Sequence, residues 1–391
     1  MMKFYKRSRI LWSIFILGVI VQVVQLTIVG CSHTSPYYHP DIPASEKQDI
    51  VTENTLHYRI LLLGDGGQPK PNEPVLKTLQ AWAQKMPEKT SIVFLGDNMY
   101  PYGMTEKKRH EASTRLDPQI EVIKSTHAHG LFIPGNHDWA SGKEGGYRAL
   151  LAQEKYINDA LFHPPKFLPQ SGSPGPVVVE FPESAPVVRV IVLDTQWWLH
   201  QHEKQQESPE MVIAELKASL DTELPIIVLG HHPLQSYGVH GGFYDWKAHL
   251  FPLRIAKKWL WIPVPIVGSL YPLARWHVVR SDQDLNGARN KNMVAQLNAA
   301  FSIIKKTPLL IYASGHDHSL QVLKGDVTDY LLVSGLASSE KATEVSHGDN
   351  TLFAHQHTGF MAIDFLADGK ILLRIVEPGT KEVLFHHWLK R

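Results

Sequence analysis

The sequence has almost no cysteine and no excess of charge of either sign. Cys31 is the one cysteine among 391 residues, which excludes an internal disulfide and cysteine-based zinc or iron–sulfur sites. The 39 Lys and Arg nearly balance the 38 Asp and Glu, so the formal net charge is +1. Without a basic field or a known nucleic-acid motif, no nucleic-acid partner is expected. Histidine, in contrast, is abundant at 22 residues, which hints at metal or phosphate chemistry.

The N-terminus carries an export signal. Four basic residues lie within the first nine, and residues 10–30 are then free of charge, as in a secretory signal. The run ends in the sequence IVGC, which resembles the lipobox of bacterial lipoproteins and implies a lipid on Cys31. The run is also close to the ~20 residues of a membrane-spanning helix. Residues 1–31 are thus predicted to be a signal peptide ending at a lipidated Cys31, or an N-terminal membrane anchor. Either places the remainder in the cell envelope, on the periplasmic or extracellular side.

Residues 32–55 are polar, contain proline and lack periodicity, which predicts a tether before a folded domain at 56–391. In that domain, short apolar runs alternate with segments of helical spacing such as 73–84, 118–128 and 209–220. The apolar runs, each followed by Gly, Asp, Asn or His, are 58–63, 91–95, 131–134, 187–193, 225–229, 309–313 and 330–333. This alternation predicts a layered α/β fold. The last three runs, 359–365, 371–377 and 382–388, predict an antiparallel meander that completes a sheet.

Five polar clusters follow strand ends, where ligands gather in α/β folds. The clusters are GDGG at 64–67, GDNMY at 96–100, GNHD at 135–138, VLGH at 228–231 and GHDH at 315–318. Hard di- or trivalent ions favour carboxylate, phenolate and carbonyl oxygens together with imidazole. Two ions about 3.5–4 Å apart need a ligand that reaches both, as a carboxylate does. One cluster alone is ordinary loop chemistry, but five in order predict a dinuclear metal site.

The order D-x-G, GDxxY, GNHD, VxxH, GHxH resembles the calcineurin-like metallophosphoesterases, and among them the purple acid phosphatases of the small tartrate-resistant type. The resemblance implies a sandwich of mixed β-sheets flanked by helices. It implies a first metal held by Asp65, Asp97, Tyr100 and His318, and a second held by Asp97, Asn136, His231 and His316, with Asp97 bridging.

The residues at positions 67 and 100 distinguish purple acid phosphatases from most other metallophosphoesterases. Most metallophosphoesterases have histidine where this chain has Gly67, and Tyr100 stands where purple acid phosphatases place a substitute ligand. A phenolate suits a trivalent ion. The resemblance thus implies Fe(III) in the first site and Fe(II), Zn or Mn in the second. The competing interpretation of Tyr100 is an ordinary aromatic residue packed under a loop.

The implied activity is that of a dinuclear-metal-dependent acid phosphatase, a phosphoric monoester hydrolase. Hydroxide held by the metals attacks phosphorus in line, and His137 protonates the leaving group as the general acid. Asp138 is a candidate for orienting His137, and His240 is a second candidate substrate-facing histidine, whereas His232 is a candidate for packing alone. The alternative is a phosphodiesterase or a nucleotide or lipid-phosphate hydrolase on the same metals. A membrane-bound interaction protein with a vestigial site is disfavoured, because all seven ligand positions are intact.

His231 and His316 are 85 positions apart, which predicts an apolar, lid-like insertion at about 243–300. Its segment 257–275 is rich in Trp and Tyr, contains prolines and is flanked by basic residues. Such a segment fits a membrane interface, or a lid packed on the protein's own core. The stretch 280–286 is a candidate border of the substrate entrance.

Overall fold

The structure, a computed structural model, describes most of the chain after the N-terminal segment. The described residues are 35–42, 52, 54–162, 164, 166–200, 207–255, 259–264, 267–304, 306–337, 342–379 and 383–390. The predictions made for residues 1–31, including lipidation of Cys31, lie outside this part of the chain. Within it, no helix combines the length and the apolar character needed to cross a bilayer.

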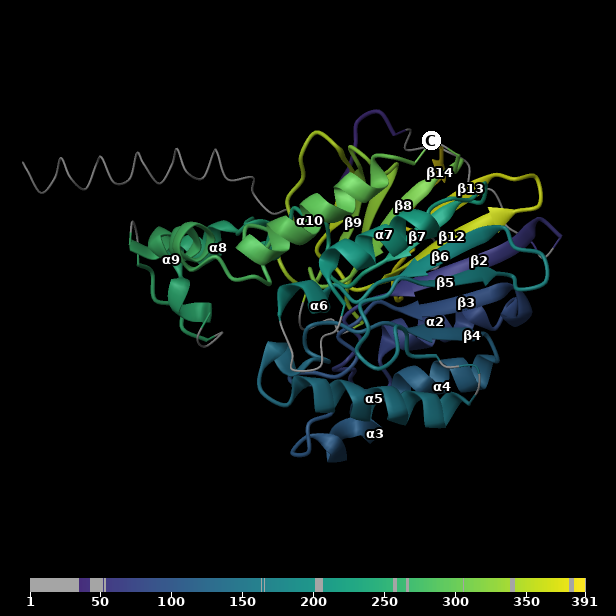
Figure 1. The fold of residues 1–391 in the computed structure, drawn as a ribbon. Helices are drawn as coiled ribbons and strands as arrows, with labels where there is room; N and C mark the ends of the chain where they lie inside the picture. Colours follow the sequence, from purple (N-terminus) through teal and green to yellow (C-terminus); the bar gives the residue numbers. More distant parts are fainter. Residues whose placement is uncertain are drawn as a thin grey trace, which may run out of the picture.

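Two mixed β-sheets lie face to face (Figure 1). The eight-stranded sheet has the order β1-β11-β9-β10-β8-β7-β6-β5, and the six-stranded sheet has the order β14-β13-β12-β2-β3-β4. The strands are β1 (Tyr37–Tyr38), β2 (Leu56–Leu63), β3 (Thr90–Phe94), β4 (His129–Phe132), β5 (Val177–Phe181), β6 (Val188–Val192), β7 (Ile226–Leu229), β8 (Leu310–Ser314), β9 (Leu320–Lys324), β10 (Tyr330–Ser334), β11 (Thr351–His355), β12 (Phe360–Leu366), β13 (Ile371–Val376) and β14 (Phe385–Leu389).

Helices cover the outer faces of both sheets. The α-helices of the described residues are α2 (Pro74–Ala83), α3 (Ala112–Arg115), α4 (Asp117–Thr126), α5 (Gly146–Leu161), α6 (Gln196–Leu199), α7 (Pro209–Ser219), α8 (Trp246–Leu250), α9 (Leu270–Ala274) and α10 (Ala288–Phe301). Proline occupies the first turn of α2, α4 and α7, where its missing N–H costs no helical hydrogen bond. Apolar residues of α2, α4 and α5 pack on the six-stranded sheet, and those of α6, α7 and α10 on the eight-stranded one. The predicted layered α/β fold is confirmed.

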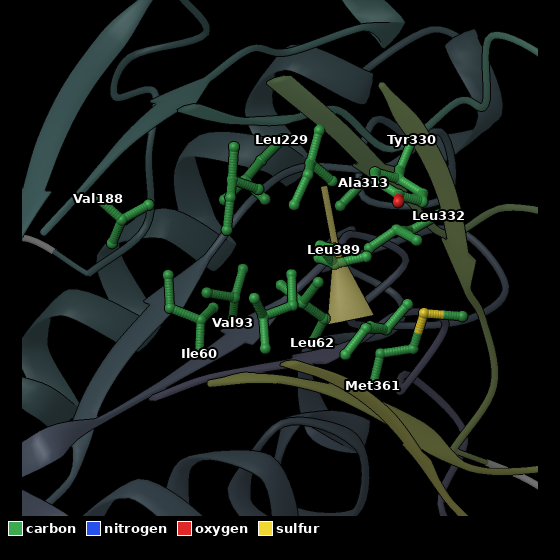
Figure 2. Close-up of a cluster of buried hydrophobic side chains, with 14 of the residues drawn as sticks. Ile60, Leu62, Val93, Val188, Leu229, Ala313, Tyr330, Leu332, Met361 and Leu389 are labelled. Atoms are coloured by element: carbon green, nitrogen blue, oxygen red, sulfur yellow. The ribbon is translucent and has the colours of Figure 1, made fainter. Parts of the chain in front are cut away.

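The central strands are buried on both faces, which explains their near-continuous apolar sequence. In β2, Ile60 and Leu62 point into the cluster between the sheets, whereas Leu61 and Leu63 point toward the helices. Figure 2 shows Ile60, Leu62 and Val93 facing Leu229 and Leu332 of the other sheet. Every strand and each of the three apolar clusters of the described part lies between residues 37 and 389. Residues 35–391 therefore contain a complete hydrophobic core.

Strand direction decides where the polar clusters lie. β2, β3 and β4 pair in parallel, and so do β6, β7, β8 and β10. The two parallel sets meet where a bridge pairs Gly64 with Gly335 and the Gly64 N–H donates to the Ser334 carbonyl at 2.6 Å. The carboxyl ends of both sets thus share one edge of the sandwich. The predicted C-terminal meander is also present, because β12, β13 and β14 pair antiparallel and extend the sheet beside β2.

Two regions differ from the sequence interpretation. Within the predicted tether, Tyr37–Tyr38 form β1, which pairs with β11, and Tyr37 stacks on His347 with 3.8 Å between ring centroids. Within the predicted insertion, α10 is part of the body, because Met293, Leu297, Ala300 and Phe301 are buried against the eight-stranded sheet. In Figure 1, α8 and α9 lie apart from both sheets, so the protruding part ends before α10.

Candidate metal centre

All seven predicted ligand residues meet at the shared edge of the sandwich. Each follows a strand closely: Asp65 follows β2, Asp97 and Tyr100 follow β3, Asn136 follows β4, His231 follows β7, and His316 and His318 follow β8. Asp65, Asp97 and His316 have φ values of 55°, 54° and 67°, in the left-handed region that non-glycine residues seldom adopt. Such backbone conformations persist only where surrounding contacts fix them, and they gather at functional sites.

Asp65, Tyr100 and His318 form the first group. The Tyr100 hydroxyl donates to Asp65 Oδ1 at 2.8 Å and lies 2.9 Å from His318 Nε2. His318 Nε2 is also 3.3 Å from Asp65 Oδ1. Tyr100 is 3% exposed, so its oxygen is a member of a buried polar cluster and does more than pack under a loop. This geometry supports the ligand role that the sequence resemblance implied for Tyr100.

Gly67 leaves no room for a further ligand. A Cβ on this residue would stand 2.4 Å from the Met99 nitrogen and 2.6 Å from the Asp97 carbonyl oxygen, both backbone atoms. Two backbone hydrogen bonds hold this contact, from Gly67 N to Asp97 O at 2.9 Å and from Tyr100 N to Gly67 O at 3.0 Å. The glycine therefore lets the loop after β2 lie directly on the loop that carries Tyr100.

Asn136, His231 and His316 form the second group. His231 Nε2 and His316 Nδ1 each lie 3.1 Å from Asn136 Oδ1 and 3.3 Å from one another. The opposite ring nitrogens donate to backbone carbonyls, His231 Nδ1 to Leu95 at 2.8 Å and His316 Nε2 to Gln283 at 2.8 Å. These outer contacts direct the opposite nitrogen of each ring toward Asn136, as in histidines that bind metals.

Asp97 lies between the two groups. Its Oδ1 is 3.4 Å from His231 Nε2 and accepts the backbone N–H of His137 at 2.8 Å. One ligand atom each from Asp65, Asp97 and His231 lies within 4.8 Å of the others. Asp97 is thus the carboxylate that lies between the two groups.

The buried carboxylates of the cluster are stabilised by nearby positive charge. Burial opposes ionisation of Asp97 and Asp65, yet neighbouring histidines outweigh it and lower the pKa of both carboxyls. Burial likewise favours neutral His231, but the Asp97 and Asp65 carboxylates raise its pKa to about 9. Two buried carboxylates in contact with hard oxygen and imidazole donors fit metal cations, which would replace this proton charge.

His137 is held beside the cluster with one nitrogen free. Its Nδ1 donates to the Pro101 carbonyl at 2.5 Å, and its ring centroid is 4.4 Å from that of Tyr100. Its Nε2 lies 3.8 Å from Asp97 Oδ2. The side chain is 28% exposed, so His137 lies between the buried cluster and the protein surface. This is the geometry that a general acid requires.

Asp138 has different contacts from those that the sequence suggested. Its carboxylate accepts hydrogen bonds from the backbone N–H groups of Asn98, Met99 and Gly135 and from the Gln153 side chain. Burial, reinforced by nearby Asp97, raises its pKa to about 6. Asp138 therefore ties the loop after β3 to the loop after β4, whereas the Pro101 carbonyl orients His137.

His240 reaches the second group through partners that sequence reasoning missed. Its ring centroid lies 4.0 Å from that of His316, and its Nδ1 lies 2.7 Å from Asp284 Oδ1. Arg275 holds the same carboxylate at 2.8 Å. Residues 280–286 thus border the site as expected. Nothing in the sequence indicated the contacts that Asp284 makes with His240 and Arg275, because these residues meet only in the folded protein.

His232 is fully buried, and one ligand atom each from His231, His232 and His316 lies within 4.8 Å of the others. Thr195 Oγ1 lies 2.8 Å from its Nδ1, and Gln283 Oε1 lies 2.9 Å from its Nε2. Burial, together with the charge of His231, holds its pKa well below the usual value. Neutral His232 packs behind the second group, consistent with a packing role.

Comparison with known proteins agrees with this geometry. Residues 58–320 match the calcineurin-like phosphoesterase family, Metallophos. No curated protein is matched. Among solved structures, GAP50, the anchor in the inner membrane complex of Plasmodium, is 18% identical with a TM-score of 0.51, covering 85% of this chain and 88% of that one. Purple acid phosphatase PPD1 from yellow lupin (Lupinus luteus) is 17% identical with a TM-score of 0.51, covering 85% of this chain and 54% of that one.

At these identities the structural likeness shows the fold alone, whereas the family match covers most of the chain. The matched region includes all seven clustered side chains and ends two residues after the last of them, His318. The chain belongs to the calcineurin-like phosphoesterase family, and it is a phosphoester hydrolase.

Proposed function

We propose that this phosphoester hydrolase is a two-metal acid phosphatase of the purple acid phosphatase type, acting on phosphate monoesters. The observation that carries the proposal is the place of Tyr100. Its hydroxyl lies within 2.9 Å of both Asp65 and His318, over a glycine that admits no side chain. A phenol in this position adds a third hard oxygen donor to the two carboxylates, which favours a trivalent ion.

Two ions fit the donor set. Fe(III) would be held by Asp65, Asp97, Tyr100 and His318, and Fe(II), Zn or Mn by Asp97, Asn136, His231 and His316. Bound there, such ions supply Lewis-acid charge for phosphoryl oxygens and a water acidified for attack. The orientation of His231 and His316, each with one ring nitrogen donating outward, supports this assignment.

The protein's own groups supply the proton and the orientation of the substrate. His137 Nε2 donates the proton to the departing alkoxide, because Nδ1 already donates to Pro101 and keeps the ring turned toward the cluster. On the other side of the cluster, His240 faces the substrate, with Asp284 and Arg275 holding its ring in place. The fully buried His232 takes no part in this chemistry.

We also propose that the enzyme is held in the cell envelope through Cys31. The support is the sequence alone, namely the basic start, the uncharged run at 10–30 and the lipobox-like IVGC. Mass spectrometry of the mature N-terminus tests this. A diacylated Cys31 as first residue is expected, and Cys31→Ser should lack the acyl groups, whereas an intact Met1 on a membrane-bound chain would favour the retained anchor.

The decisive experiment measures metal content, visible absorption and turnover for residues 35–391 and for Tyr100→Phe. Two metals per chain including iron are expected, with a visible charge-transfer band that the variant loses or shifts. A colourless, active protein without iron would leave a metallophosphoesterase but overturn the Fe(III) assignment. Comparing a phosphate monoester with a diester, a nucleotide and a lipid phosphate tests the substrate class. Faster diester turnover would favour the alternative activity.

A further inference from the structure

The part of the insertion that protrudes from the body has an unusual composition. Residues 246–281 contain six cations, Lys247, Arg254, Lys257, Lys258, Arg275 and Arg280, and no Asp or Glu. Since the whole chain has a net charge of +1, the remaining residues together carry −5. The segment is therefore strongly positive, whereas the rest of the chain has a net negative charge. We call its described residues, 246–255, 259–264 and 267–280, the arm.

The arm also exposes large apolar side chains. Those with the greatest exposed fractions are Trp246 (46%), Trp259 (71%), Trp261 (52%), Ile262 (52%), Val267 (58%), Leu270 (60%), Val278 (77%) and Val279 (69%). α8 and α9 have five residues each, and no apolar cluster of the body includes a residue of the arm. The arm is thus not a lid packed on the protein's own core. Apolar surface gathered in this way marks a site of interaction.

We propose that the arm is a docking surface for an anionic lipid bilayer. Trp and aliphatic side chains beside Lys and Arg are the combination that enters a membrane interface, and the absence of acidic residues removes repulsion from lipid phosphates. Arg254 illustrates the arrangement, because its guanidinium lies 3.8 Å from the centroid of the Trp261 ring. The same chain carries the uncharged run at residues 10–30, outside the described residues, which suits a membrane-held protein.

The arm is joined to the catalytic centre. Arg275, on the arm, holds the Asp284 carboxylate that contacts His240, and the Trp276 carbonyl accepts a hydrogen bond from the Asn286 side chain. The Gly242 backbone leaves room for the Trp276 ring, which would lie 2.7 Å from a Cβ there. A docked arm would therefore hold the active site close to the bilayer and not at the end of a loose tether.

Co-sedimentation of residues 35–391 with vesicles tests the proposal. This chain keeps the complete core but lacks the N-terminal run, so binding to the vesicles must come from the folded protein. We expect binding to vesicles that contain phosphatidylglycerol and weaker binding to pure phosphatidylcholine. Replacing two cations of the arm, the half-buried Lys247 and the exposed Arg280, in Lys247→Gln with Arg280→Gln should weaken binding to the anionic vesicles about tenfold. Replacing apolar contacts, Trp259→Ser with Ile262→Ser and Val278→Ser, should weaken binding by at least about tenfold.

The matched control is Phe162→Ser with Met211→Ser, which removes apolar side chains that are 76% and 54% exposed on the body. It should bind vesicles like the unmodified chain, and thermal melting checks that all variants fold. Failure of the unmodified chain to bind anionic vesicles would overturn the proposal, as would equal losses in control and arm variants. A concentration-dependent dimer that the apolar variant dissociates, without vesicle binding, would identify the arm as a contact between copies instead.

Discussion

The ligand loops and the arm both consist of short turns between short elements, yet their burial is opposite. Asp65, Asp97 and His231 are at most 2% exposed, whereas Trp259 and Val278 are 71% and 77% exposed. The ligand loops lie on one another through backbone contacts that leave no space for a Cβ at Gly67 or Gly135. The polar side chains of the ligand loops are thus buried where loops pack tightly on one another. The apolar side chains of the arm are exposed where few contacts hold the chain. Substitutions should therefore be costly in the first region and almost free in the second.

The largest effect is expected at Asp97, which links both ligand groups. In Asp97→Asn, turnover of an aryl phosphate should fall by at least about 10³-fold, because the bridging charge is lost. Metal content measured on the same sample should fall below that of the unmodified chain. Near-normal turnover with full metal content would show that another residue bridges the ions. Asp138→Asn is not a suitable control, since its carboxylate joins two of the loops.

The next largest effect is expected for His137→Ala. If His137 protonates the leaving group, turnover of alkyl phosphates should fall about 10²-fold or more. Turnover of p-nitrophenyl phosphate, whose leaving group needs no proton, should fall much less. The ratio of the two rates is the measurement. An equal loss on both substrates would argue that His137 binds substrate and does not transfer a proton.

Substitutions of Asp284 test the contact that links the arm, through Arg275, to His240. Asp284→Asn should lower kcat about tenfold by releasing the ring of His240, with unchanged metal content. Asp284→Glu should restore part of the rate, which a purely structural role would not produce. Asp282→Asn is the control, because its carboxylate is more exposed and pairs with Arg289 at 3.8 Å. An unchanged kcat in Asp284→Asn would show that the contact between the arm and His240 does not affect catalysis.

A smaller effect concerns the stability of the body in acid. Burial, with Lys166 nearby, lowers the pKa of His129 from 6.5 to about 4. Since the unfolded chain then binds the proton more tightly, the stability contributed by neutral His129 is present above pH 6.5 and is lost as the pH falls toward 4. His129→Gln should remove up to about 2 kcal/mol of this acid destabilisation. Chemical unfolding at several pH values measures it, and parallel pH profiles for both proteins would refute the assignment.

The smallest effect is expected on the arm. Val278→Ser with Val279→Ser should change the free energy of unfolding by less than about 0.5 kcal/mol, because both side chains already face solvent. The body counterpart is Val228→Ser, in a fully buried strand, which should cost about 2 kcal/mol or more. Comparable losses at both places would mean that the arm packs on the body and would weaken the contrast.

The sequence determined the layers of the fold and which polar side chains meet at one edge of the sandwich. Strands such as β2 are buried on both faces, so their apolar runs are visible without a structure, and a ligand placed just after such a run must lie at the strand's end. The pattern does not reveal strands β5, β9 and β11, because short strands of mixed polarity lack it. The place of Tyr100 in this cluster was also predictable, because it follows the same strand as Asp97.

Only the tertiary structure decided which side chains orient the chemistry. The partners of His137, His231 and His316 are backbone carbonyls, which carry no mark in a sequence. The Asp284 carboxylate lies 44 positions from His240 and meets it only because the insertion folds back onto the site. The same holds for Asp138. Its place next to His137 suggested that it orients this histidine, whereas its buried hydrogen bonds join the loops after β3 and β4. Sequence spacing determines what a strand presents at its end, whereas contacts between loops depend on how the strands are assembled.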